Sequence, residues 1–256
     1  MIDSHAHLGL CEPSPEELVA AAREAGVDRI LTIGLGEDSN PGVIELAREH
    51  EQVFAAVGRH PNSAAGFYEL DAEELERLAA SEEVVAVGET GLDWYREGAP
   101  ADEQRRAFLG QIRVAQQVEK PLVVHLRDRE QSEDAATEAF STLEAEGAGL
   151  EIVLHCFSAG PRWAARAAEL GWYCSFAGNL TYPSAERVRE AAALVPDELL
   201  LVETDSPYLA PQPSRGKPNQ PANVVATAER LAEVRETDYE RIESLVTANA
   251  ARLFGW

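Results

Sequence analysis

Short apolar runs alternate with amphipathic stretches along the whole chain. An apolar run of roughly four to eight residues bounded by turn residues is typical of a buried strand, whereas apolar positions three and four residues apart are typical of a surface helix. The pattern predicts strands over Ile2–His7, Arg29–Leu35, Val53–His60, Val84–Glu89, Leu122–Leu126, Ile152–Cys156, Trp172–Phe176 and Leu199–Asp205. It predicts helices near Pro15–Ala25, Pro41–His50, Ala72–Ala80, Asp102–Val118, Glu130–Glu146, Pro161–Leu170, Ala185–Leu194, Pro221–Glu236 and Tyr239–Leu253.

This alternation predicts the architecture. Strands that alternate with helices form a parallel sheet with helical crossovers. Eight such units in 256 residues are typical of the closed TIM (β/α)8 barrel, which runs to about 250 residues as one unit. No GxGxxG stretch follows the first predicted strand, which argues against an open dinucleotide-binding sheet. We therefore expect an α/β fold with a single domain over residues 1–256.

The loop after the last predicted strand, residues 206–221, is rich in proline. It carries Pro207, Pro211, Pro213, Pro218 and Pro221. A long structured loop in a compact domain is usually functional. In a (β/α)8 barrel the loops that follow the strands build the active site.

The charge balance is strongly acidic, with 45 acidic residues against 22 basic ones and a net charge of −23. The hydrophobic content of 45% argues against a disordered acidic tail. Such a surface could repel nucleic acid, because phosphate binding usually uses basic groups. We favour a third interpretation, a halophilic protein whose self-repulsion is screened in a salt-rich cytoplasm. It predicts that both folding and activity need salt on the order of molar.

Cysteine usage and hydropathy indicate a cytoplasmic protein. Cys11, Cys156 and Cys174 are widely spaced and form no CxxC motif, so a disulfide framework or a cysteine-rich zinc site is not expected. No stretch approaches the roughly 20 apolar residues that span a bilayer, and the chain does not begin like a signal peptide. We expect no membrane association and no obligate protein partner.

Several polar residues are placed where a barrel could bind metal. Side chains alternate along a strand, so His5 and His7 share one face of the first predicted strand. Four further residues each end an apolar run predicted as a strand: Glu89, His125, His155 and Asp205. A closed barrel brings these strand ends to one face, where we expect the six side chains to converge.

Carboxylates clustered at a barrel mouth repel one another unless cations neutralise them, and divalent ions supply that charge. Four histidines, one Glu and one Asp are enough ligands for two ions, with Glu89 between them. Nitrogen and oxygen ligands suit Zn, Mn or Fe, and suit Mg less because it prefers oxygen. We expect two divalent ions, with Zn, Mn and Mg as the metals to test.

Seven stretches resemble, in order, the motifs of the TatD-type metal-dependent deoxyribonucleases of the amidohydrolase superfamily. They are Asp3–Leu8, Gly58–Pro61, Gly88–Asp93, Pro121–Arg127, His155–Ser158, Glu203–Leu209 and Arg215–Asn219. They span nearly the whole chain, so the resemblance is specific for the family and less specific for the substrate.

The resemblance implies a ligand set for each ion. The first ion would be held by His5, His7, Glu89 and Asp205. The second would be held by Glu89, His125 and His155. His60 matches a family histidine near the site, and we assign it to substrate binding. Some relatives have a second histidine where this chain has Asn62, so Asn62 is assigned no role.

The chemistry follows from this ligand set. Two ions about 3.5–4 Å apart can lower the pKa of a bound water and hold both oxygens of an in-line displacement. We assign catalytic roles to Glu89 and to Asp205, which would orient the water and accept its proton. Arg127, Arg215 and Lys217 are candidates to neutralise a substrate phosphate, because they follow the fifth predicted strand or lie in the proline-rich loop.

Four other residues were considered. Glu203 shares the face of Asp205 one layer deeper and could support the ligands. Cys156 has the opposite strand parity to His155, which predicts that it packs toward the helices. Trp94 and Tyr95 closely follow Glu89, where base stacking and ordinary loop packing both remain open.

The leading hypothesis is a hydrolase that cleaves DNA phosphodiesters, as an exonuclease in one version, with DNA as the partner. A second hypothesis keeps the metals and cleaves another ester or amide, such as an aminoacyl linkage on tRNA. A third, a non-catalytic metal-binding interaction protein, does not explain a bridging Glu or an Asp placed to accept a proton.

Overall fold

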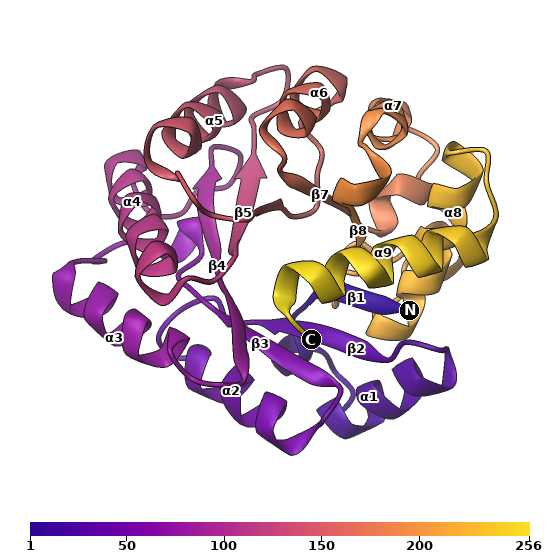
Figure 1. The fold of residues 1–256 in the computed structure, drawn as a ribbon, viewed down its shortest axis with the longest axis horizontal. Coiled ribbons are helices and arrows are strands. Elements are labelled where there is room, and N and C mark those ends of the chain that lie inside the picture. Colours follow the sequence, from indigo (N-terminus) through magenta and orange to yellow (C-terminus); the bar gives the residue numbers. More distant parts are fainter.

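The computed structural model describes the backbone of residues 1–256 and all side chains except that of Pro213. Eight parallel strands follow one another around a sheet in chain order, β1 to β8 (Figure 1). The strands are β1 (Ile2–Ala6), β2 (Arg29–Ile33), β3 (Val53–Val57), β4 (Val84–Asp93), β5 (Leu122–Arg127), β6 (Ile152–Leu154), β7 (Tyr173–Phe176) and β8 (Leu200–Val202). The expected α/β barrel is confirmed.

Helices ring the strands on the outside, as Figure 1 shows. They are α1 (Pro15–Glu24), α2 (Asn40–Glu49), α3 (Glu69–Ala79), α4 (Ala101–Val118), α5 (Asp134–Glu146), α6 (Pro161–Leu170), α7 (Glu186–Leu194), α8 (Val224–Val234) and α9 (Tyr239–Phe254). Each predicted helix has a counterpart, and most ends agree within about three residues, the usual uncertainty at frayed ends. None of the described helices combines the length and the apolar character that crossing a bilayer requires.

Backbone bonds between the end of β1 and the segment that follows β8 close the barrel. The Asp205 amide donates to the His5 carbonyl at 2.9 Å, and the His7 amide donates to the Ser206 carbonyl at 2.8 Å. Deeper in the barrel, the Ser4 hydroxyl donates to the Val202 carbonyl at 2.9 Å. Closure therefore places the segment after β8 directly beside His5 and His7.

Several strand ends differ from the prediction, and the differences at β4, β6 and β8 change where residues of the site lie. β4 continues beyond Glu89, because it pairs with β5 as far as Asp93 and Arg127, so Glu89 lies in mid-strand. β6 ends before His155 and β8 ends before Asp205. The backbone then leaves the extended conformation: φ is +45° at Cys156, two residues after β6, and +54° at Asp205, three residues after β8.

Gly88 explains how β4 can carry a buried carboxylate so close to β5. Its φ is +145°, and a Cβ at this position would lie 2.6 Å from the Val123 carbonyl oxygen. A residue with a side chain would therefore collide with the neighbouring strand. The strand next to Glu89 can pack tightly only because Gly88 has no side chain.

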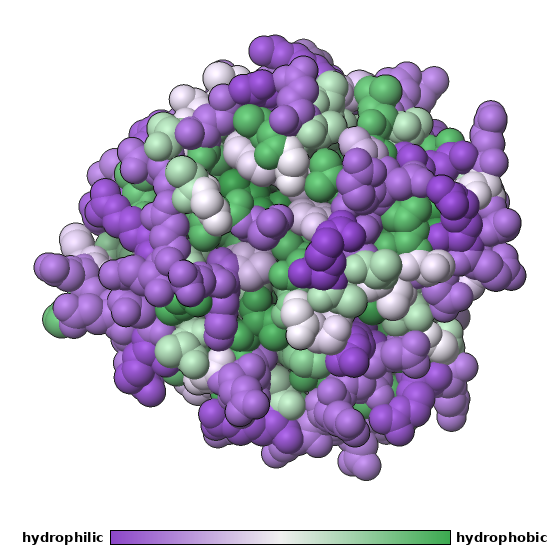
Figure 2. Space-filling view, in the orientation of Figure 1, coloured by the Kyte–Doolittle hydropathy of each residue, from purple (hydrophilic) through white to green (hydrophobic). Residues whose placement is uncertain are grey.

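One end of the barrel is covered by α9, which crosses it in Figure 1. The Asn249 side chain donates to the Leu200 carbonyl at 2.9 Å, at the start of β8. In the same view, hydrophilic residues dominate the outer rim of the molecule, and hydrophobic ones show between them nearer the centre (Figure 2). The opposite end, where the strands finish, carries the candidate site.

The surface holds more carboxylates than its cations can neutralise. Asp197 pairs with both Arg235 and Arg241, and Glu133 pairs with both Arg162 and Arg187. With 45 acidic and 22 basic residues, one-to-one pairing would still leave 45 − 22 = 23 carboxylates unmatched. The predicted halophilic behaviour rests on this excess and stays a prediction.

We expect the melting temperature to rise by several degrees between dilute buffer and about 1 M KCl, because the Debye length falls from about 10 Å at 0.1 M to about 3 Å. Thermal melts monitored by circular dichroism measure this. A variant carrying Glu12→Gln, Glu51→Gln and Glu82→Gln, all at exposed sites, should depend less on salt. Maximal stability in dilute buffer would contradict the halophilic interpretation.

Candidate metal centre

Glu89 lies at the centre of the site, and its two carboxylate oxygens face different histidines. The side chain projects into the barrel and is 3% exposed. Oε2 lies 3.3 Å from His5 Nε2 and 3.8 Å from His7 Nε2. Oε1 lies 2.6 Å from His125 Nδ1 and 2.7 Å from His155 Nε2. One carboxylate thus joins two separate groups of ring nitrogens.

The first group combines the two ends of the chain. His5 and His7 come from β1 and its end, and Asp205 comes from the segment that closes the barrel. Asp205 Oδ1 lies 3.4 Å from His7 Nε2 and 3.9 Å from His5 Nε2. The His7 Nδ1–H donates to the Ile33 carbonyl at 3.2 Å, which leaves the lone pair on Nε2 facing the group.

The second group contains His125 and His155, whose inward nitrogens are 3.2 Å apart. In both rings the other nitrogen contacts a carboxylate. His125 Nε2 lies 3.3 Å from Asp93 Oδ2, and His155 Nδ1 lies 3.2 Å from Glu203 Oε1. An outward N–H held by a carboxylate or a carbonyl is the usual way in which a protein presents a histidine lone pair to a metal.

His60 also reaches the cluster, but it presents an N–H donor to the cluster where the other rings present a lone pair. Its Nε2 lies 3.6 Å from Glu89 Oε1, while its Nδ1 accepts a hydrogen bond from the Asn62 amide at 3.0 Å. Burial lowers the pKa of His60 to about 4, so the ring is neutral near pH 7 and carries its proton on Nε2. His60 therefore presents a donor to the site.

The residues present fit divalent metal. Among the described residues, the fully buried His5 has no hydrogen-bond partner at either ring nitrogen, which is costly unless something else satisfies them. Ligands about 2.0–2.2 Å from one tetrahedral ion lie roughly 3.3–3.6 Å apart. In the first group the contacts of His5 and His7 with Glu89 and Asp205 span 3.3–3.9 Å, close to that spacing.

The electrostatics of Glu89 are consistent with a carboxylate that stays charged. Burial alone would raise the pKa of Glu89, but His155, His60 and His125 around it hold the pKa well below its usual range. Asp3 behaves differently: burial raises its pKa to about 8, although it accepts hydrogen bonds from Thr204. Asp3 thus braces the segment before Asp205, with its carboxylate 2.9 Å from the Thr204 amide.

Sequence reasoning missed two residues that support the site. Asp93 was counted only as part of a motif, yet it holds His125 and also accepts from the amides of Tyr95 and Arg96, each at 2.9 Å. Asn62 was assigned no role, but its side chain donates to Asp93 Oδ2 at 3.2 Å. A period-two strand pattern cannot reveal such contacts, because they join the end of β4 to loop residues and to the neighbouring strand.

Glu203 contacts the cluster from deeper in the barrel, in agreement with the expectation that it could support the ligands. Its side chain is fully buried, and Oε1 accepts from the Cys156 amide at 2.8 Å as well as from His155. Its Oε2 has no partner among the described residues. One carboxylate oxygen of Glu203 lies within 4.8 Å of ring nitrogens of His5 and His155. Glu203 therefore orients at least one ring of the cluster.

Cys156 does not follow its predicted orientation. With β6 ending at Leu154, strand parity no longer applies, and the backbone turns to φ +45° at Cys156. The Asn179 side chain lies 4.0 Å from the Cys156 sulfur, on the loop after β7. The thiol is therefore directed toward the loops at the barrel mouth, and burial raises its pKa well above the usual range.

The three predicted phosphate-binding cations lie around the cluster and outside it. The Arg127 guanidinium stacks on Tyr95 at 4.2 Å, and the Arg215 guanidinium stacks on Tyr182 at 3.8 Å. Arg215 and Lys217 are exposed. The structure thus places cations on two sides of the mouth, and their role toward a substrate remains a prediction.

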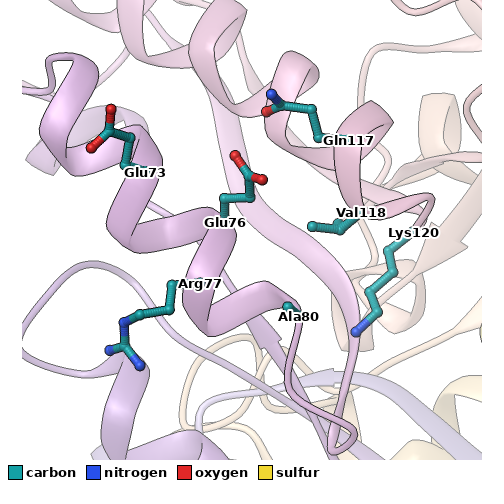
Figure 3. Close-up of a pocket in the computed structure, with 7 residues that line it drawn as sticks. All are labelled: Glu73, Glu76, Arg77, Ala80, Gln117, Val118 and Lys120. Carbon is teal, nitrogen blue, oxygen red and sulfur yellow. The ribbon is translucent and has the colours of Figure 1, made fainter.

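A separate hollow of about 580 Å³ lies between α3 and α4, away from the cluster (Figure 3). Glu73 and Glu76 of α3 line it opposite Gln117 and Val118 of α4. Lys120 belongs to its lining, but the Lys120 ammonium donates to the Ser81 carbonyl at 3.0 Å. One of the chain's two lysines thus has a structural contact here, far from the strand ends that carry the site.

Comparison with known proteins agrees with this geometry. The family model "TatD related DNase" matches residues 2–255. A Bacillus subtilis protein, the uncharacterized metal-dependent hydrolase YabD, is 36% identical over 99% of this chain and 98% of its own. The Escherichia coli 3'-5' ssDNA/RNA exonuclease TatD is 34% identical over 94% of this chain and 92% of its own.

A solved structure shows the same fold. That of YJJV, a TatD homolog from Escherichia coli, has a TM-score of 0.91 at 27% identity and covers 100% of this chain and 98% of that chain. The chain belongs to the TatD family of metal-dependent hydrolases, within the amidohydrolase superfamily. Its buried His and carboxylate clusters are the metal-binding feature of that class.

We predict that Glu203→Ala weakens Zn or Mn binding by about 10- to 100-fold, the usual effect of removing a group that orients a histidine ligand. Glu203→Gln should lose less, because its amide oxygen can still accept from His155. Competition titration against a chromogenic chelator measures the affinities. Glu198→Gln, an exposed carboxylate a few residues away, is the control. Unchanged affinity in Glu203→Ala would show that Glu203 does not orient the ligands.

Proposed function

We propose that this protein hydrolyses phosphodiester bonds in nucleic acid, DNA in the first place, using two divalent metals. The proposal rests on one observation: the two carboxylate oxygens of Glu89 face two different groups of ring nitrogens. A carboxylate so placed can bridge two ions. Paired ions are suited to in-line displacement at phosphorus, where both the attacking and the leaving oxygen need stabilisation.

The ligands are assigned as follows. One metal would be held by His5, His7, Glu89 and Asp205, and the other by Glu89, His125 and His155. When bound, the metals supply an acidified water and positive charge at the phosphate. Zn and Mn suit the mixed nitrogen and oxygen set, whereas Mg suits it less.

The chain's own residues would then complete the reaction. Asp205 orients the attacking water through one carboxylate oxygen and accepts its proton. His60, with its proton on Nε2, donates a hydrogen bond to a phosphate oxygen, which agrees with its assignment to substrate binding. Arg127, Arg215 and Lys217 neutralise the phosphates on either side of the mouth.

A nucleic-acid substrate is supported by the name of one relative, an exonuclease on single-stranded DNA and RNA, and by the cations around the mouth. Cleavage of another ester or amide, such as an aminoacyl linkage, uses the same metals and is the competing function. Assays of the metal-loaded protein on single-stranded DNA, duplex DNA, RNA and aminoacyl-tRNA separate them. Turnover of aminoacyl-tRNA alone would overturn the nuclease proposal.

Removing the metals should abolish hydrolysis and lower the melting temperature, because bound ions stabilise the state that binds them. The protein is treated with a chelator, its fold is checked by circular dichroism, and Mn, Zn or Mg is then restored. We expect about two equivalents of metal to restore full activity. Full activity in the folded, metal-free protein would falsify the mechanism.

Glu89→Gln and Asp205→Asn should each lower kcat on the order of 100-fold or more, because each loses a charge that the transition state needs while keeping its shape. Steady-state kinetics on a single-stranded oligonucleotide, with melting curves to confirm folding, measure the effect. Glu198→Gln removes a carboxylate outside the site and should keep normal turnover. A near-normal kcat in either site variant would mean that its catalytic assignment is wrong.

A further inference from the structure

A cavity of about 490 Å³ lies between the loops that follow β4, β5 and β6, at the end of the barrel that carries the metal cluster. Its walls include Tyr95, Arg127, Arg129 and Ser158. Arg127 is two residues beyond His125 on β5, so the two side chains share one face of the strand. The volume is within the roughly 300–1,000 Å³ typical of small-ligand sites. The cavity is thus large enough for a nucleotide next to the reacting phosphate.

The cavity has cations that are not neutralised by neighbouring carboxylates. Most arginines at other parts of the surface pair with acids, as Arg48 does with Glu83 at 2.7 Å. By contrast, neither Arg127 nor Arg129 forms an ion pair with a described side chain. Arg127 lies over the Tyr95 ring, and Arg129 Nε donates to the Trp94 carbonyl at 2.9 Å. Both guanidiniums keep N–H groups for an anion.

Two acids that line the cavity are already engaged. Asp128 accepts from the amides of Ala135 and Ala136 at the start of α5, at 2.6 and 3.4 Å. Glu133 is held by Arg162 and Arg187. Glu130 also lines the cavity, so its charges balance overall, but on a chain with a net charge of −23 a balanced lining with two arginines free of ion pairs still offers N–H donors to a phosphate.

Tyr95 provides an aromatic platform. Its ring is held by Arg127 on one side, and the residue is 50% exposed. Its amide donates to Asp93 Oδ1 at 2.9 Å, and Asp93 Oδ2 is the oxygen beside His125. The platform is therefore held at a fixed place relative to the metal cluster. Bases stack on such exposed rings regardless of sequence.

We propose that this cavity is a nucleotide subsite, in which the base next to the cleaved bond stacks on Tyr95 and the adjoining phosphate binds Arg127 and Arg129. The inference rests on the proposed nuclease function and names the residues that would hold the substrate next to the metals. A base can lie on Tyr95 only when it has left its own stack and pair. A single-stranded end meets this requirement, as in the substrates named for the Escherichia coli exonuclease TatD.

The test compares Tyr95→Leu and Tyr95→Phe on metal-loaded protein with single-stranded oligothymidylate. Leu retains bulk and loses the ring, whereas Phe retains the ring. We expect Tyr95→Leu to raise KM about tenfold or more, the loss of one stacked base, with kcat little changed, and Tyr95→Phe to behave like the parent. Arg127→Ala should also raise KM and reduce the slope of log affinity against log salt by about one.

Tyr68→Leu is the matched control. Tyr68 is 60% exposed and carries the Arg106 guanidinium at 4.6 Å, so it resembles Tyr95 in exposure and stacking but does not line the cavity. It should leave KM and kcat unchanged. Tyr68→Leu and Tyr95→Leu raising KM equally would overturn the subsite, because the effect would then not depend on the cavity.

Substrates with an abasic nucleotide show which base of the strand stacks on Tyr95. An abasic nucleotide is placed in turn at each of the three positions nearest either end of the strand. At one position the abasic nucleotide should lower kcat/KM of the parent enzyme about tenfold. At the same position it should not lower kcat/KM of Tyr95→Leu further, because this variant has already lost the stacking ring. If the parent cleaves single strands and Tyr95→Leu matches it on every substrate, the subsite is wrong and the nuclease proposal stands. If the metal-loaded parent cleaves no nucleic acid, both are overturned.

Discussion

The structure depends on a carboxylate buried inside the barrel among ring nitrogens. Glu89 is held in mid-strand on β4, where water is excluded and an unpaired charge would be severely destabilising. The histidines that face it remove that penalty only if they stand at fixed positions around both oxygens. His7, His125 and His155 are each fixed by a second hydrogen bond from the far side of the ring. The carboxyls of Asp93 and Glu203 and the Ile33 carbonyl thus determine which nitrogen faces the cluster.

Some features of this site can be predicted from the sequence, and others cannot. Strand parity places His5 and His7 on one face, and the barrel brings Glu89, His125, His155 and Asp205 to the same end, because these are properties of regular strands. Parity failed at Cys156, where the strand had ended and a positive φ changed the direction of the side chain. Asn62 and Asp93 were missed for a related reason. Asn62 lies in the loop after β3 and contacts Asp93 at the end of β4, and the geometry of a loop has no period that the sequence displays.

The acidic surface and the cationic mouth act over different distances. Excess carboxylates over the whole surface create a field that repels polyanions at low salt, and salt screens this field within a few ångströms. Arg127 and Arg129 act at contact distance, where screening is weak and geometry decides. The arginines elsewhere mostly neutralise nearby acids, whereas these two are held by a ring and a carbonyl. A strongly acidic protein can therefore still hold a phosphate locally, with salt permitting the approach.

Closure of the barrel is a precondition for the first ligand group. His5 and His7 belong to the first strand and Asp205 to the segment after the last, about 200 residues later in the chain. They meet only when the amides of His7 and Asp205 have bonded across the β1–β8 junction. Asp3 strengthens the same junction from inside by holding Thr204. The group that would bind metal therefore forms only in the completed fold. A metal bound there adds its binding free energy to the closure of the whole barrel, since ions that bind only the native state stabilise it.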